Sequence, residues 1–278
     1  MFSERYGLLA AGLGALAMWG GACQNTEPRL DTKPATVLVS AAISLADVFG
    51  AVADVYERKT GTRVLLNLAG SNLLVNQLIA GAPIDVIISA DVRQMDRAEA
   101  AGLIRAGGRM NLLSNQLVVV VPVDRVGTVT TVDDLASPEV GRIALGDPDA
   151  VPAGVYARDY LESIGLWSVL RGKVVPTRNV RAALAAVEAG TVAAGFVYRT
   201  DAAMATNVVR AFEVPIDTGP FIVYPAAVVS AAPNATEASR LFEFLRGSEA
   251  RRLFEGAGFI ALQPAVSEAS GLFTTSSK

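Results

Sequence analysis

The residues that could do chemistry in this chain are few, and their types already exclude several classes of protein. The 278 residues include no histidine and only one cysteine. Histidine-based catalytic triads, histidine metal sites and histidine acid–base pairs are therefore impossible. A single cysteine also excludes cysteine-rich zinc sites and any disulfide within the chain. The sequence contains no phosphate-binding glycine motif and no G-x-S-x-G nucleophile motif. Without histidine a hydrolase would need a Ser–Lys pair or two carboxylates, and nothing in the sequence identifies a nucleophile with its base.

The charged residues favour neither catalysis nor nucleic-acid binding. Asp85 and Asp91 flank an apolar run, and Asp147 and Asp149 lie in GDPDAV. Aspartates in such places usually cap helices or form turns. The chain has 24 Lys and Arg against 27 Asp and Glu, a net charge of −3 without any basic run. We therefore predict that the protein is not an enzyme and does not bind nucleic acid.

A different kind of site is indicated where apolar strands lead into helices. Small or amide residues open the predicted helices at Ser44, Ser71, Pro152-Ala153-Gly154 and Asn179-Val180. A helix N-terminus presents backbone N–H groups without intrahelical partners, together with a partial positive charge. Each junction alone is far more commonly an ordinary N-cap, but several aimed at one point would bind an anion without Arg or Lys. The carboxyl ends of parallel strands are where α/β folds bind ligands, so the set predicts an anion site.

Strands and helices alternate along most of the chain, which predicts an α/β fold with largely parallel sheets. Short apolar runs predict strands, and apolar residues at helical spacing predict helices. The predicted strands are 36–42, 62–69, 84–90, 117–122, 142–147, 173–177, 193–198, 208–215 and 221–230. The predicted helices are 44–60, 73–81, 92–101, 155–165, 180–190, 235–247 and 248–258.

The first segment of the chain reads as an export signal. Residues 7–22 form an uncharged run that is shorter than the roughly 20 apolar residues of a membrane span, and it follows Arg5. We predict a signal peptide over 1–22, lipidation of Cys23, and a flexible polar tether within 23–35. A plain secretory signal with an incidental Cys23, or an uncleaved membrane anchor, are the alternatives.

Six stretches within 36–262 are distinctive when taken together: SAAISLADVF (40–49), AGSNLLVNQLIAGAPIDVIISAD (69–91), LLSNQLVVVVP (112–122), ALGDPDAVPAGVYARDYL (144–161), NVRAALAAVEAG (179–190) and GFVYRTDA (195–202). With them the chain resembles the molybdate-binding proteins of bacterial ABC importers, which are periplasmic solute-binding proteins. It implies two α/β lobes, each with a mostly parallel sheet flanked by helices, joined by two crossover strands. The implied lobes are 36–117 plus 226–278, and 118–225.

The resemblance also implies a ligand site for molybdate or tungstate in the cleft between the lobes. The matching positions are Ser44, Ser71, Ala153, Val180 and Tyr198, with Asn72 as a possible accessory donor. The two serines would offer hydroxyl and backbone N–H groups, Ala153 and Val180 backbone N–H groups alone, and Tyr198 its phenol hydroxyl. No cofactor and no metal coordinated by the protein is expected, because molybdenum would be held as its oxyanion.

The implied role is an extracytoplasmic receptor that delivers its anion to an ABC permease with its ATPase. The protein is expected to be a monomer, either anchored through lipidated Cys23 on the outer side of the cytoplasmic membrane or periplasmic without the lipid. A receptor for sulfate or another oxyanion on the same fold, or a ligand-sensing module, are the alternatives.

Overall fold

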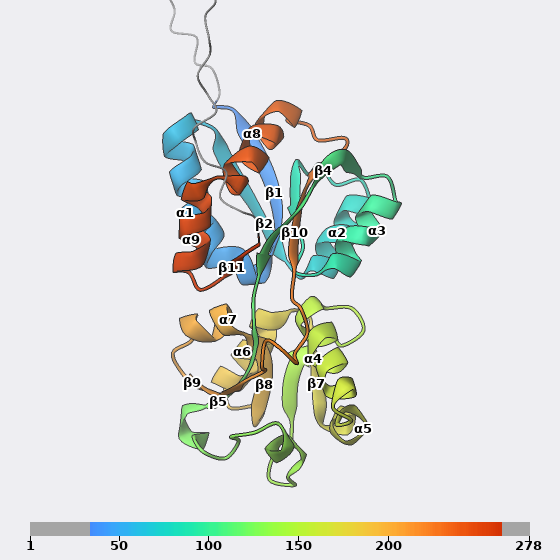
Figure 1. Cartoon of the computed structure of the whole chain (residues 1–278), viewed down its shortest axis with the longest axis vertical. Helices are drawn as coiled ribbons and strands as arrows, with labels where there is room; N and C mark the ends of the chain where they lie inside the picture. The colour runs from blue at the N-terminus through green and yellow to red at the C-terminus, as the bar shows by residue number, and fades with distance from the viewer. Residues whose placement is uncertain (1–33, 263–278) are drawn as a thin grey trace, which may run out of the picture. The chain divides into compact units, whose positions relative to one another are not determined.

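The computed structural model describes residues 34–262, and the predicted signal peptide, Cys23 and most of the tether lie outside these residues. The described part of the chain forms two β-sheets, each flanked by helices on both faces (Figure 1). We call each sheet with its helices a lobe. Within residues 34–262, no helix is long and apolar enough to cross a membrane.

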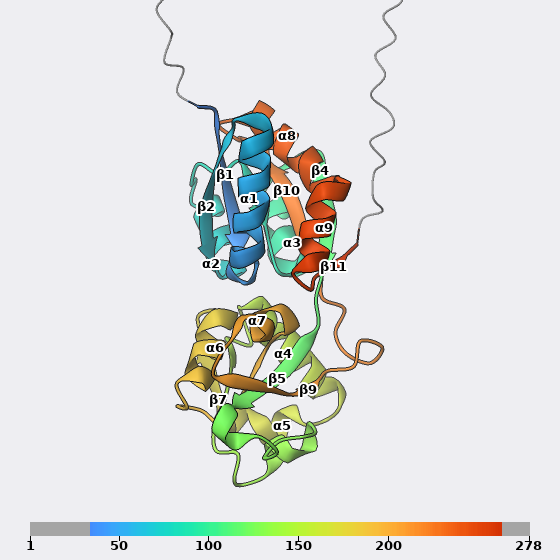
Figure 2. The same ribbon diagram turned by 90° about the vertical axis from the view of Figure 1, so that its left-hand side faces the viewer.

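The first lobe is built on a six-stranded sheet with the order β11-β4-β10-β3-β1-β2. Figures 1 and 2 show α1, α8 and α9 on one face of this sheet and α2 and α3 on the other. The strands are β1 (Thr36–Ala42), β2 (Arg63–Ala69), β3 (Val86–Ile88), β4 (Ile104–Ser114), β10 (Tyr224–Val229) and β11 (Ile260–Ala261). The helices are α1 (Ala46–Thr60), α2 (Ser71–Ile79), α3 (Val92–Ala100), α8 (Ala235–Arg246) and α9 (Ser248–Gly256), with a 3₁₀ turn η1 (Ile43–Leu45) before α1.

The second lobe is built on a five-stranded sheet with the order β7-β6-β8-β5-β9. Its strands are β5 (Leu117–Pro122), β6 (Ile143–Gly146), β7 (Val174–Thr177), β8 (Ala194–Tyr198) and β9 (Val208–Glu213). Its α-helices are α4 (Pro152–Ser163), α5 (Trp167–Leu170), α6 (Val180–Glu188) and α7 (Arg199–Met204), and its 3₁₀ turns are η2 (Val123–Arg125), η3 (Asp133–Ala136) and η4 (Arg171–Lys173). Strand β5 is buried along its whole length, as expected for a continuous apolar run covered on both faces.

Both sheets are mixed, with parallel strands at one side and antiparallel strands at the other. Strand β1 pairs in parallel with β2 and β3, and β6 pairs in parallel with β7 and β8. Strands β10, β11 and β5 pair antiparallel with their neighbours. The predicted parallel character therefore holds for the strands that lead into α1, α2, α4 and α6, which are the junctions singled out in the sequence.

Two chain segments link the lobes, one between β4 and β5 and one between β9 and β10. Figure 1 shows both segments passing from one sheet to the other. Residues 115–116 form the first link and 214–223 the second, so Tyr224 already belongs to the sheet of the first lobe. The second predicted lobe boundary, at residue 226, thus falls inside β10.

Most predicted elements are confirmed, and the differences are local. Gly61 ends α1 with a φ of 74°, a left-handed conformation that glycine adopts without steric cost. Helix α2 begins at Ser71 and α4 at Pro152, in both cases earlier than predicted. Strand β4 and the short helices α5 and α7 were not predicted, because Arg105 to Gly108 reads as a turn and short helices give little periodic signal.

Candidate functional site

A small pocket lies between the two lobes, and all five residues predicted as ligand donors line it. The first lobe contributes the end of β1, the turn η1 and the start of α2, and the second lobe contributes the starts of α4 and α6 and the end of β8. The lining residues are Ala42, Ile43, Ser44, Ala69, Gly70, Ser71, Ala90, Val151, Pro152, Ala153, Asn179, Val180 and Tyr198.

The position of each donor follows from the end of a strand. Strands β1, β2, β6 and β7 run directly into the segments that open α1, α2, α4 and α6, and β8 ends at Tyr198. Because these strands are parallel within each lobe, their carboxyl ends meet at one edge of each sheet. The first N–H groups of each helix lack intrahelical acceptors and therefore remain available to a ligand.

The first lobe supplies two buried serines. Ser71 is the first residue of α2, and its Oγ accepts a hydrogen bond from the Ala90 N–H at 2.9 Å. One lone pair of this hydroxyl is thus occupied, so its proton is left to donate into the pocket. Ser44 lies in η1, and its Oγ is 3.1 Å from the Tyr224 Oη. Both serine side chains are therefore held in place by the protein before any ligand arrives.

The second lobe supplies backbone donors from two helix starts. Ala153 is the second residue of α4, where Pro152 occupies the first turn and needs no N–H acceptor. Val180 opens α6, and the Asn179 side chain caps this helix by accepting from the Ala182 N–H at 2.9 Å. Capping uses the Ala182 N–H and leaves the N–H of Val180 at the pocket.

Helix α4 approaches β6 so closely that only glycine fits at the contact. A Cβ added to Gly154 would lie 1.8 Å from the Gly146 carbonyl oxygen and 2.8 Å from the Asp147 carbonyl oxygen. Such distances are far inside van der Waals contact, so any side chain would push α4 outward. Gly154 therefore fixes where the Ala153 N–H lies relative to the end of β6.

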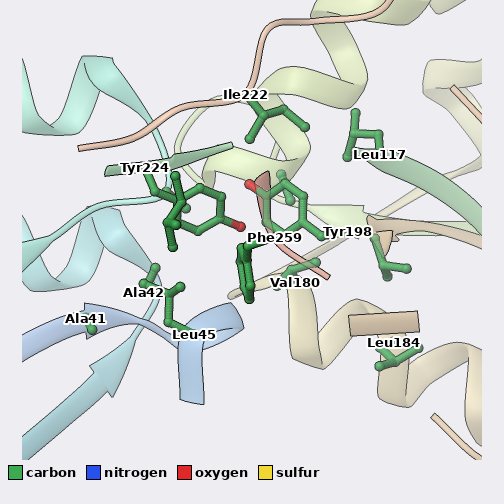
Figure 3. Close-up of a cluster of buried hydrophobic side chains, with 14 of the residues drawn as sticks. Ala41, Ala42, Leu45, Leu117, Val180, Leu184, Tyr198, Ile222, Tyr224 and Phe259 are labelled. Atoms are coloured by element: carbon green, nitrogen blue, oxygen red, sulfur yellow. The ribbon is translucent and has the colours of Figure 1, made fainter. Parts of the chain in front are cut away.

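Tyr198 ends β8 with its side chain fully inside the molecule, 1% exposed. Its hydroxyl oxygen is buried and has no hydrogen-bond partner within the described part of the chain. Burial raises the pKa of Tyr198 well above its usual value, so the phenol stays protonated and acts as a donor. Figure 3 shows its ring beside that of Tyr224, at a centroid distance of 5.7 Å. A buried donor without an acceptor is costly unless a ligand supplies one.

The structure places the predicted accessory residue differently. Asn72 lines a neighbouring hollow together with Asp147, Thr177 and Arg178, and it is not among the residues that line the pocket. Its Oδ1 lies over Gly70, where an added Cβ would be 2.8 Å away. Asn72 thus packs beside the donors of α2, and the predicted direct contact with ligand finds no support from its position.

The pocket is uncharged, and charges gather outside it. Among the described residues that line it, none carries a charged side chain. Beside it, the Arg181 guanidinium of the second lobe pairs with Asp47 of the first at 2.5 Å and with buried Asp201 of its own lobe. A second ion pair between the lobes joins Arg93 to Asp159 at 2.7 Å. These two ion pairs join the lobes outside the pocket.

The buried carboxyl of Asp201 is the most perturbed acid near the pocket. Burial raises its pKa to about 7, against the lowering effect of the Arg181 guanidinium. The group is held by Arg181 and does not line the pocket. Within residues 34–262, no cluster of three or more Cys, Asp or Glu side chains could hold a metal ion.

If Val180 acts through its backbone N–H, its side chain should matter for packing and not for affinity. Replacing Val180, which is 3% exposed, with alanine is expected to lower the free energy of unfolding by about 1–2 kcal/mol. Anion affinity should change by less than about threefold, since an N–H is present in either residue. Chemical denaturation and calorimetry on the same preparation measure the two effects. A large loss of affinity with little loss of stability would show that the side chain itself contacts the ligand.

Two α/β lobes joined by two links, with a donor-lined pocket between them, define a solute-binding protein of the two-lobed class. The sequence matches the profile of the bacterial extracellular solute-binding proteins over residues 37–260. The chain belongs to this family, which is a family of binding proteins and not of enzymes.

Named relatives agree with this assignment. The molybdate-binding protein ModA of Escherichia coli is 37% identical over 80% of this chain and 88% of its own length. A Bacillus subtilis protein, YvgL, named as an "ABC transporter substrate-binding lipoprotein", is 33% identical over 93% of this chain and 99% of its own. The solved structure of the Azotobacter vinelandii periplasmic molybdate-binding protein matches with a TM-score of 0.72, at 22% identity, over 81% of this chain and 98% of that one. This last likeness shows the shared fold.

Proposed function

We propose that this protein is the receptor of an ABC importer, and that it captures molybdate, and comparably tungstate, in the pocket between its lobes. The observation that carries the proposal is the buried, unpartnered hydroxyl of Tyr198 in a pocket that is also lined by two serines and by the helix starts at Ala153 and Val180. The similarity to the E. coli molybdate-binding protein supports the choice of anion.

The chemistry of the pocket favours an anion that carries no proton. The hydroxyls of Ser44, Ser71 and Tyr198 and the N–H groups of Ala153 and Val180 can all donate, and the lining contains no carboxylate. Phosphate near neutral pH keeps a proton that would need an acceptor, and leaving that proton unpaired costs about 1–3 kcal/mol. Molybdate, tungstate and sulfate are fully deprotonated dianions, so each can accept from every donor.

Binding by both lobes would stabilise the state in which the lobes are in contact. An anion that accepts hydrogen bonds from Ser44 and Ser71 on one side and from Tyr198 on the other binds this state better than an open one. A ligand shifts such an equilibrium by its difference in affinity for the two states. We propose that a membrane permease recognises the liganded form and that an ATPase supplies the energy for import.

Calorimetry with molybdate, tungstate, sulfate and phosphate tests this function. We expect tight and comparable binding of molybdate and tungstate, weaker binding of sulfate, and the weakest binding of phosphate. Sulfate offers the same acceptors on a smaller anion, so a preference for sulfate would instead favour a sulfate receptor on this fold. The absence of binding to all four anions would reject the proposed function.

Removing one serine hydroxyl should weaken molybdate binding without abolishing it. Ser44→Ala and Ser71→Ala each remove a hydrogen bond to a charged acceptor, which is worth about 1.5–2 kcal/mol, or roughly tenfold to thirtyfold in affinity. Ser163→Ala is a matched control, because the Ser163 hydroxyl bonds to the Tyr160 carbonyl oxygen away from the pocket. Unchanged affinity in both pocket variants would place the anion elsewhere.

Export and anchoring complete the proposal. We propose that Cys23 becomes the lipid-modified first residue of an exported monomer that needs no cofactor; the name of the Bacillus subtilis relative agrees with lipidation. One acyl chain binds a membrane only weakly, so more than one chain is required for stable anchoring. Mass spectrometry of the native N-terminus distinguishes a chain that begins at lipidated Cys23 from a plain cleaved or an uncleaved one.

A further inference from the structure

Behind Ser44 lies a chain of buried polar side chains that comes from both lobes. The Ser44 Oγ is 3.1 Å from the Oη of Tyr224, at the start of β10. The Asn115 Nδ2 is 3.5 Å from the same Oη and 2.9 Å from the Oγ1 of Thr200 in α7. Asn115 belongs to the first link between the lobes, so it joins a residue of the first lobe to one of the second. All four side chains are at most 5% exposed.

The orientation of the Asn115 side-chain amide is fixed by the hydrogen bond that its oxygen accepts. Its Oδ1 accepts a hydrogen bond from the Gln116 N–H at 2.9 Å. Since a backbone N–H can only donate, the atom that faces it must be the oxygen. The NH₂ group therefore faces Thr200 and Tyr224, and it donates to both.

The Asn115 amide in turn determines which hydroxyl, that of Tyr224 or that of Ser44, donates the hydrogen bond between them. The Tyr224 Oη receives a proton from Asn115, so its own proton is left for the Ser44 Oγ. In the reverse arrangement, with Ser44 donating to Tyr224, the buried Tyr224 proton would have no acceptor among the partners found in residues 34–262. Burial keeps this phenol protonated by raising its pKa. The arrangement that satisfies every group leaves the proton of Ser44 to point into the pocket.

We propose that Tyr224, itself held by Asn115, is a positioning residue that keeps the Ser44 hydroxyl aimed into the pocket as a hydrogen-bond donor. This inference rests on the proposed function, because it concerns how the same pocket is prepared for its anion. Tyr224 does not line the pocket and acts only through Ser44. Because the Ser44 hydroxyl is already oriented before the anion binds, less side-chain entropy is lost on binding.

A double-mutant cycle on the purified protein tests the relay. Tyr224→Phe removes the hydroxyl and keeps the ring, and it should weaken molybdate binding by about threefold to tenfold, the effect of one neutral hydrogen bond. In the Ser44→Ala background the same change should weaken binding by less than about twofold, because the hydroxyl that Tyr224 orients is gone. A role of Tyr224 in general packing would lower affinity equally in both backgrounds.

A control substitution at Tyr56 and a second substitution in the relay, at Asn115, complete the test. Tyr56→Phe also removes a buried phenol hydroxyl, in the core against Phe244, and should leave affinity unchanged. Asn115→Ala removes the amide that donates to Tyr224, and its effect on affinity should likewise be mostly lost in the Ser44→Ala background. Equal losses in both backgrounds, or no loss in the wild-type background, would overturn the relay. Failure of the wild-type protein to bind any of the four anions would instead overturn the proposed function, and the relay with it.

Discussion

Replacing Tyr198 with phenylalanine is expected to weaken molybdate binding by about tenfold to 150-fold and to stabilise the ligand-free protein. The hydroxyl is the only part of the side chain that is removed, and it has no partner among the described residues. Without ligand this donor is unsatisfied, a state that costs about 1–3 kcal/mol. With a dianion in the pocket it makes a charge-assisted hydrogen bond, worth about 1.5–3 kcal/mol. One substitution thus moves stability and affinity in opposite directions.

Thermal unfolding without ligand and calorimetry with molybdate measure the two effects of Tyr198→Phe. A gain of about 1 kcal/mol corresponds to roughly 2–4 °C in Tm for a protein of this size. Tyr56→Phe is the matched control, because its buried hydroxyl also lacks a partner within residues 34–262 but lies away from the pocket. The control should gain stability and keep its affinity. If Tyr198→Phe lost stability, or bound molybdate as well as the wild type, the phenol would not be the ligand donor.

The substitution Gly154→Ala is expected to cost both stability and affinity. The new Cβ would lie 1.8 Å from the Gly146 carbonyl oxygen, so α4 must move away from β6 by about 1 Å. We expect the free energy of unfolding to fall by about 3 kcal/mol or more. The Ala153 N–H moves with the helix, and a shift of this size weakens a hydrogen bond severely, so molybdate affinity should fall by about tenfold to a hundredfold.

The control for this change is another helical glycine. Gly50 lies within α1, and a Cβ added there meets nothing within 4 Å. Gly50→Ala should raise the free energy of unfolding by about 0.5–1 kcal/mol, because alanine loses less backbone entropy in a helix. Denaturant unfolding of both variants, with calorimetry, separates the steric effect from helix propensity. Wild-type stability in Gly154→Ala would mean that α4 can retreat from β6 without consequence, which contradicts the account given for the Ala153 donor.

Much of the binding pocket could be predicted because its donors stand at local sequence signals. Ser44, Ser71, Ala153 and Val180 each open a helix after an apolar strand, and such junctions are visible in the residues themselves. That these junctions meet in one pocket is a matter of topology, and only the resemblance to a known family implied it. Tyr198 carries no local signal as a donor, because a tyrosine that ends a buried strand reads equally as a packed aromatic side chain.

The remaining features depend on contacts between distant parts of the chain. Strand direction was not predictable, since β5 and β10 pair antiparallel yet read like the buried parallel strands beside them. Strand β4 contains Gly107 and Gly108, which favour a turn, and it is held as a strand by pairing with β10. The relay behind Ser44 joins residues 180 positions apart in the sequence, so nothing near Ser44 indicates it.

The donors that face one another across the pocket also bear on when the lobes come together. When no anion lies between them, the helix starts and hydroxyls of the two lobes face each other with the same, positive, partial charge. The Tyr198 hydroxyl is then buried without an acceptor among the described residues. These effects raise the free energy of the state in which the lobes are in contact without an anion. A bound oxyanion supplies the hydrogen-bond acceptors that both lobes lack. The ligand-free protein would then rarely adopt the state with its lobes in contact. A transporter that recognises this state would therefore run few transport cycles without an anion.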